Sequence, residues 1–173
     1  MILIRLLVSA SLAAAAVDYN AWNFEAADSA IRRFLGDKVI GLIVPRDRFA
    51  PPIVVSLIDD SGGPRNLVQW RQFTQQKLSR SAPETVLNEV MIQGPHGAGY
   101  LATMARSLHG EPLIQVVLYL PGRKRVLQFT YESQQQGRQR NSDLGYTDWL
   151  NEVARGQHEP LVTQWFAGRF PNP

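Results

Sequence analysis

The stretch LIQVVLYLPGRKRVLQFTYE, residues 113–132, decides the fold. Two runs rich in leucine, β-branched and aromatic side chains, 113–120 and 126–132, flank a short segment that contains proline and glycine. Runs of this composition joined by a few turn residues are typical of a β-hairpin. The sequence therefore predicts two neighbouring antiparallel strands here.

Two further strands are predicted just before this hairpin. TVLNEVMIQ (85–93) and YLATMARSL (100–108) are separated by the glycine-rich segment GPHGAG (94–99), and HGEP (109–112) forms the next turn. Glycines let the chain bend sharply and let backbones approach closely. Consecutive strands with connections this short pair as an antiparallel meander.

The first half of the chain supplies two more strands and a helix. KVIGLIV (38–44) and PPIVVSLID (51–59) are strand-like runs bounded by proline and by the turn DDSGGP. A helix is predicted over 67–80, because apolar residues recur at helical spacing and Asn66 with Gln69 matches a capping box.

The remaining segments complete the predicted fold. Apolar residues at helical spacing indicate a short helix over 24–35, and the polar segment 133–145 is expected to be a mobile loop. Two C-terminal helices are marked by Trp149, Leu150 and Val153, and by Leu161, Trp165 and Phe166. The fold class is therefore α+β, with an antiparallel sheet flanked by helices in an α/β/α sandwich.

The N-terminal stretch LLVSASLAAAA, residues 6–16, resembles an export signal. It follows one basic residue, is uncharged and ends in small residues, which predicts a signal peptide over 1–16 and a single domain over 17–173. The run is too short for a stable membrane span. Two alternatives remain for this stretch: a structural segment of the domain, or an uncleaved anchor. A cleaved signal predicts a periplasmic protein, whereas a structural segment predicts a cytoplasmic one.

Composition excludes several classes of function. The formal net charge of +3 is small and dispersed, so no nucleic-acid partner is predicted. The absence of cysteine excludes disulfides, thiolate metal sites and a cysteine nucleophile. The three histidines have no ligand spacing, so no metal and no cofactor are predicted.

No catalytic motif emerges. A Gly-x-Ser-x-Gly elbow is missing, and Ser107 with His109 at a predicted strand end matches an exposed hairpin turn better than a nucleophile and its base. The adjacent carboxylates Asp59 and Asp60 match a turn better than a calcium loop. No catalytic residue is therefore predicted, and a small hydrolase is the least favoured function.

The order of these segments resembles the DcrB-like branch of the PsbP-like superfamily. The resemblance covers roughly 37–167 and rests on DKVIGLIVP (37–45), IVVSLIDD (53–60), the helix and strand of 66–90, GAGYLATM (97–104) and 113–132. It implies an antiparallel sheet between helices, mostly non-enzymatic members and no shared catalytic residues. The segment FEAADSAIRRFLG departs from the family, because it lacks the expected proline.

The favoured function is a non-enzymatic periplasmic binding or adaptor protein that contacts another protein through the sheet face or 133–145. An immunity protein against a secreted toxin is a close variant, and a cytoplasmic chaperone or adaptor for a type VI secretion effector is the alternative. The candidate binding residues are aromatic, histidine or arginine side chains, namely Trp22, His96, Tyr100, Arg106, Arg138 and Arg140.

The export signal is testable by the intact mass of the native protein from separated periplasm and cytoplasm. We expect periplasmic material that begins at Val17, because the small residues before it suit signal peptidase. Full-length material confined to the cytoplasm would contradict an export signal and support the chaperone alternative.

Overall fold

The computed structural model describes eight segments of the chain. These are residues 22–45, 51–60, 65–78, 85–95, 97–108, 111–121, 125–134 and 140–157. Predictions that fall elsewhere, including the signal peptide over 1–16 and the helix marked by Trp165, lie outside the described residues.

Seven strands form one antiparallel sheet in the order β1-β2-β3-β7-β6-β5-β4. Four consecutive strands, β4 to β7, form the predicted meander. In chain order the elements are β1 (Asn23–Ala26), α1 (Ser29–Leu35), β2 (Val39–Val44), β3 (Ile53–Asp59), α2 (Leu67–Leu78), β4 (Thr85–Gly94), β5 (Gly97–Leu108), β6 (Glu111–Pro121), β7 (Arg125–Gln134) and α3 (Arg140–Ala154).

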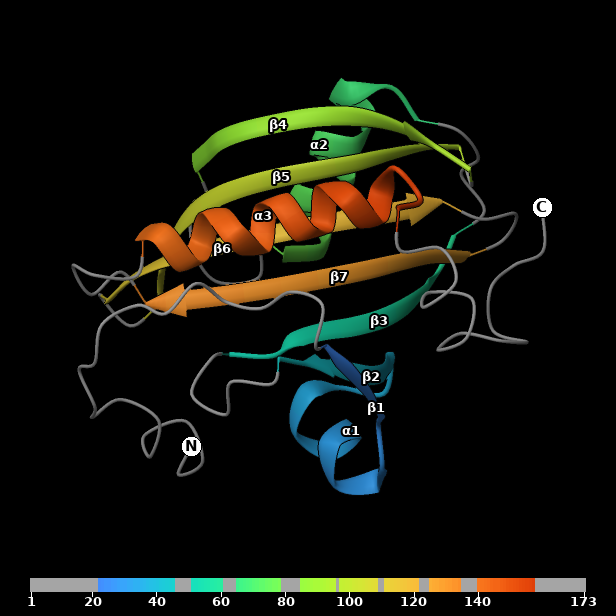
Figure 1. The fold of residues 1–173 in the computed structure, drawn as a ribbon, viewed down its shortest axis with the longest axis vertical. Coiled ribbons are helices and arrows are strands. Elements are labelled where there is room, and N and C mark those ends of the chain that lie inside the picture. Colours follow the sequence, from blue (N-terminus) through green and yellow to red (C-terminus); the bar gives the residue numbers. More distant parts are fainter. Residues whose placement is uncertain are drawn as a thin grey trace.

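Helices cover both faces of the sheet. Figure 1 shows α3 lying across one face, over β6, and α2 behind β4 and β5 on the other. The predicted α+β class, an antiparallel sheet flanked by helices, is confirmed. Among the described residues, no helix is long and apolar enough to cross a membrane.

Strand β6 is the centre of this arrangement. Every residue from Leu113 to Leu120 is buried. Alternate side chains point to opposite faces, so Val116 and Leu118 join the cluster beneath α3, and Val117 and Tyr119 join the cluster beneath α2. The sheet thus has two apolar faces, and each needs a covering layer.

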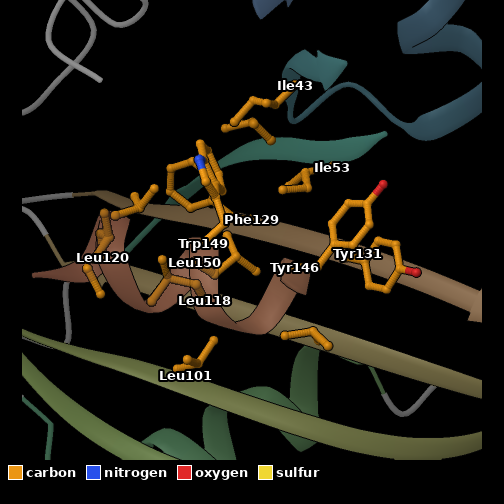
Figure 2. Packing of buried hydrophobic residues seen from close by; sticks show 14 of the residues in the cluster. Ile43, Ile53, Leu101, Leu118, Leu120, Phe129, Tyr131, Tyr146, Trp149 and Leu150 are labelled. Atoms are coloured by element: carbon orange, nitrogen blue, oxygen red, sulfur yellow. The ribbon is translucent and has the colours of Figure 1, made fainter. Parts of the chain in front are cut away.

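Aromatic rings hold α3 to the sheet. The Trp149 ring stacks on Trp22, with ring centroids 4.9 Å apart, and the Tyr146 ring stacks on Tyr131 of β7 at 3.8 Å. The Tyr146 hydroxyl donates a hydrogen bond of 2.5 Å to the carbonyl of Pro51. Figure 2 shows Trp149 and Leu150 directed from α3 toward the sheet, with the two tyrosine rings together.

The helix expected over 24–35 is wrong in its first half. Residues 23–26 form β1, which pairs antiparallel with β2 and places Phe24 against the backbone of Gly41. A side chain at Gly41 would collide with the Phe24 ring. Tertiary pairing therefore overrides the helical spacing of the apolar residues.

Helix α1 begins later than expected. The Asp28 carboxylate caps it by accepting a hydrogen bond of 2.8 Å from the Ile31 amide. The helix ends at Gly36, as expected, where φ is +108°. None of its seven residues is buried.

The polar segment 133–145 is not one continuous loop. Strand β7 extends to Gln134 and α3 begins at Arg140, so the end of this segment is helical. The apolar residues from Tyr146 onward bury one side of α3, and that burial favours extension of the helix toward its polar N-terminal part. The helix predicted over 67–80 is described as far as Leu78.

The close approach of α3 to β4 at Gly94 is testable by substitution. A Cβ atom there would collide with the carbonyl oxygen of Ala154. We expect Gly94→Ala to lower the free energy of unfolding by about 1–3 kcal/mol, as overpacking usually does. Urea unfolding measures the change. Gln93→Ala, at an exposed neighbour, is the control, and equal stability of the two variants would contradict the contact.

Candidate functional site

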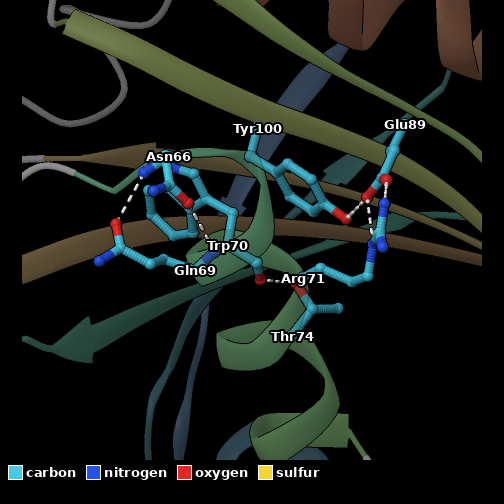
Figure 3. Close-up of polar contacts among 7 residues, drawn as sticks. All are labelled: Asn66, Gln69, Trp70, Arg71, Thr74, Glu89 and Tyr100. Atoms are coloured by element: carbon cyan, nitrogen blue, oxygen red, sulfur yellow. Dashed lines mark hydrogen bonds and ion pairs between the residues drawn. The ribbon is translucent and has the colours of Figure 1, made fainter.

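Helix α2 is tied to β4 and β5 through the Glu89 carboxylate. Glu89 lies on β4 opposite Ala102, so its side chain shares the α2 face of the sheet with Tyr100 of β5. The Tyr100 hydroxyl donates to Glu89 Oε2 at 2.7 Å, and Arg71 of α2 donates from Nε to Oε2 at 3.2 Å and from Nη2 to Oε1. Figure 3 shows the tyrosine and the arginine converging on this carboxylate.

The protonation states of this cluster follow from its geometry. The Arg71 guanidinium holds the pKa of the Glu89 carboxyl below its usual value, and the Tyr100 hydrogen bond acts in the same direction. Burial raises the pKa of Tyr100 well above its usual range. At neutral pH the site therefore contains a carboxylate and a neutral phenol. Arg71, Glu89 and Tyr100 together hold α2 on the sheet and are here called the Glu89 latch.

An aromatic cluster fills the space beneath α2. The Trp70 ring stacks on Tyr119 and Tyr100, with centroids 5.3 Å and 6.1 Å apart. The Arg65 guanidinium lies 4.3 Å from the centroid of Phe73 and makes two hydrogen bonds, of 2.5 and 2.6 Å, to Asp60. These contacts fix the face of α2 that packs on the sheet.

The predicted capping box begins α2. The Asn66 side chain accepts from the Gln69 amide and the Gln69 side chain accepts from the Asn66 amide, both at 2.9 Å. This reciprocal pair satisfies two amides that a helix start leaves unpaired. It fixes the residue at which α2 begins, and Figure 3 shows the two hydrogen bonds of this pair.

A second polar group lies on the same face of the sheet. Arg106 Nη1 of β5 donates to Gln115 Oε1 at 3.3 Å, and Gln115 Nε2 donates to Glu132 Oε1 at 2.5 Å. Gln115 is buried, whereas 47% of the Glu132 side chain is exposed. This chain of hydrogen bonds links β5, β6 and β7.

The structure separates the candidate binding residues. Tyr100 and Arg106 share the α2 face of β5, Tyr100 being buried and Arg106 half-buried. Trp22 is buried in the opposite cluster, under α3. Arg140 begins α3, while His96 and Arg138 lie outside the described residues. A binding role for these residues stays a prediction.

Arg71 and Glu89 were not among the candidates, although their positions carried a signal. The helical phase set by Trp70 places Arg71 beside the packed face of α2, and strand alternation places Glu89 on a sheet face. Only the tertiary structure shows that this side of α2 meets this face of β4. Of the pair considered for hydrolysis, Ser107 is exposed at the end of β5 and His109 lies outside the described residues.

Exposed apolar side chains gather around the outer strand β4. Val68 of α2 is 55% exposed, Leu87 is 56% exposed and Val90 is 42% exposed. Leu87 falls within a β-bulge between Val86 and Asn88. Val68, Leu87 and Val90 are here called the β4 edge patch.

Val68 and Val90 lie on opposite sides of the sheet. Val68 lies one helical turn before Arg71 on α2, the helix that is bound to β4 through Glu89. Val90 pairs with Leu101, which belongs to the cluster under α3, so its side chain lies on that face. The patch therefore extends over both faces of the sheet at this edge.

No metal site is found in the described part of the chain, where no three His, Asp or Glu side chains are grouped.

Comparison with known proteins finds similarity in fold and not in sequence family. No family model and no curated protein matches the chain. It is similar to CyanoP, the cyanobacterial PsbP of Synechocystis (9% identity, 76% of this chain and 79% of that one, TM-score 0.46). It is similar to LpqN of Mycobacterium tuberculosis, involved in cell envelope biogenesis (16%, 77% and 76%, TM-score 0.45). It is also similar to the Ran-binding protein Mog1p of Saccharomyces cerevisiae (13%, 76% and 79%, TM-score 0.45).

The Glu89 latch makes stability depend on pH. Because the pKa of Glu89 is lowered in the folded state, its stabilisation is complete above the ordinary value of about 4.5 and is lost as the pH falls through the folded value. We expect Glu89→Gln to be less stable than the parent protein at pH 7 and to approach it at pH 3. Urea unfolding across this pH range measures the difference.

The matched control is Glu25→Gln, which removes an exposed carboxylate from β1. A stability difference between Glu89→Gln and the parent protein that does not change with pH would contradict the latch.

Proposed function

We propose that the protein is a non-catalytic binding or adaptor protein that works in the periplasm by contact with another protein. The β4 edge patch is the observation that carries this proposal, because Leu87 and Val90 of the outer strand and Val68 of α2 expose apolar surface. Clustered apolar side chains on a surface are typical of sites where proteins associate.

The charged groups near the patch support a role in binding rather than in chemistry. Arg71 and Glu89 are bound to each other, and Arg65 is bound to Asp60. Groups held in ion pairs keep their charge at neutral pH, whereas a general acid or base needs a pKa near the working pH. These pairs hold α2 in place and stiffen the framework that presents the patch.

A stiff framework favours association. Partners that are already ordered lose less conformational entropy when they bind. The patch lies on α2, which is bound through Arg71, and on β4, which pairs with β5 from Thr85 to Gly94 except at the bulge. The surface is therefore formed before a partner arrives.

The compartment rests on the predicted signal peptide over 1–16. An immunity protein that neutralises a secreted toxin and a cytoplasmic adaptor for a type VI secretion effector would both use an apolar surface of this kind. They differ from the main proposal in partner and, for the adaptor, in compartment.

A photo-crosslinking amino acid at position 90 tests the proposal in the native host. We expect Val90→p-benzoylphenylalanine to form one discrete adduct with another protein in the periplasmic fraction, because this exposed side chain lies within the contact. The adduct should disappear when Val68→Lys is added.

The same amino acid in place of Phe34 is the control. Phe34 is 75% exposed on α1, beside the opposite edge of the sheet. Equal adducts from positions 34 and 90, or no adduct from positions 68, 87 and 90, would contradict a binding role for the β4 edge patch.

A further inference from the structure

We propose that the outer edge of β4 binds an extended segment of another protein, which adds to the sheet as an eighth strand. The inference rests on the proposed function and specifies how the partner is held. The segment is apolar at alternate positions, and it is neutral or acidic.

The position and composition of β4 leave its edge open. It is the last strand of the sheet, ten residues long, and within the described residues it pairs only with β5. Alternate amides and carbonyls of such a strand point away from the sheet and offer hydrogen bonds to another strand. Proteins block exposed edges with proline or lysine, and residues 85–94 contain neither.

The only charge on β4 does not protect the edge. Glu89 is turned toward α2, and its carboxylate is bound by Arg71 and Tyr100. The bulge at Leu87 is confined to the start of the strand, and the register is regular from Asn88 to Gly94. Seven consecutive residues, spanning about 23 Å at 3.3 Å per residue, can therefore accept a partner strand.

The β4 edge patch explains why the partner segment should alternate. An added strand places successive side chains on the two faces of the sheet. Those on the α3 face would lie beside Val90, and those on the other face would lie on the side of α2. Cross-strand neighbours of this kind stabilise pairing when they are apolar or β-branched.

The opposite edge of the sheet provides a contrast. Strand β1 has four residues, and the exposed apolar side chains near it, Phe34 and Leu35, lie on α1 rather than on a strand. Four residues offer an added strand fewer backbone hydrogen bonds than the ten residues of β4. Among the described residues, a long edge strand with exposed apolar side chains occurs at β4 alone.

Charge complementarity favours a neutral or acidic segment. The Arg71 side chain is 44% exposed, and its bonds to Glu89 use Nε and Nη2. A guanidinium has five N–H donors, so Arg71 can also bind an acceptor on a strand that lies beside β4. A lysine or arginine at the same place has no acceptor for these donors.

A second copy of this chain is a poorer occupant. Two β4 strands paired about a two-fold axis would bring both α2 helices to the same face and both Arg71 guanidinium groups to the seam. A separate extended segment does not bring a second α2 helix or a second Arg71 to the seam.

Selection of random twelve-residue peptides from a display library against the full chain tests the proposal. We expect enriched peptides to lack proline and to alternate apolar residues. A synthetic enriched peptide should bind the Val90→Lys variant about tenfold more weakly or worse, because a charge on this edge opposes strand pairing. Phe34→Lys, a matched change at the other edge, should change binding by less than about twofold.

Peptide N-methylation distinguishes strand addition from other modes of binding. Methylating alternate amides on one edge of the peptide should abolish binding, whereas the same modification shifted by one residue should preserve it. Thermal unfolding of each protein variant shows that it is folded.

Enriched peptides that are helical, that bind Val90→Lys as tightly as the parent, or that tolerate both methylation patterns would overturn the proposal, as would a selection without binders. If position 90 still forms its adduct in cells, the binding function stands and only strand addition fails. If the adduct is also missing, both fail.

Discussion

The structure depends on the burial of β6 from both sides. A strand with apolar side chains on both faces cannot leave either face in water, because exposing one apolar side chain costs about 1.5–3 kcal/mol. The residues from Leu113 to Leu120 impose this condition on the middle of the sheet. Strands β5 and β7 cover the edges of β6, and α2 and α3 cover its two faces.

The two covering helices are attached by different means. Helix α3 is held by stacked aromatic rings, with Trp149 on Trp22 and Tyr146 on Tyr131. Helix α2 combines aromatic stacking of Trp70 with the ionic latch to Glu89. The latch joins α2 to the outermost strand, so it fixes the surroundings of the β4 edge patch. The same contacts that stabilise the fold thus shape the surface assigned to partner binding.

Sequence patterns predicted the elements with long or strongly marked signals. The hairpin of β6 and β7, the meander, the two early strands and the capping box at Asn66 are all confirmed. The helix predicted over 24–35 was wrong in its first half, because apolar residues at helical spacing also suit a strand that packs Phe24 on Gly41. The start of α3 was missed, because the polar composition before Tyr146 resembles a loop. Among the candidate site residues, Tyr100 belongs to the latch, but its partners Arg71 and Glu89 were not recognised.

The sequence by itself determined most of the strands and helices and that the sheet must be covered on both faces, because hydrophobic periodicity and turn residues act locally. Tertiary structure alone decided that β3 pairs with β7, which joins the first three strands to the meander and leaves β4 at an outer edge. It also decided that Arg71 meets Glu89 across 18 residues of chain, which places α2 over β4. These contacts depend on the order of strands in space, and that order is set by the joint packing of distant segments rather than by any one of them.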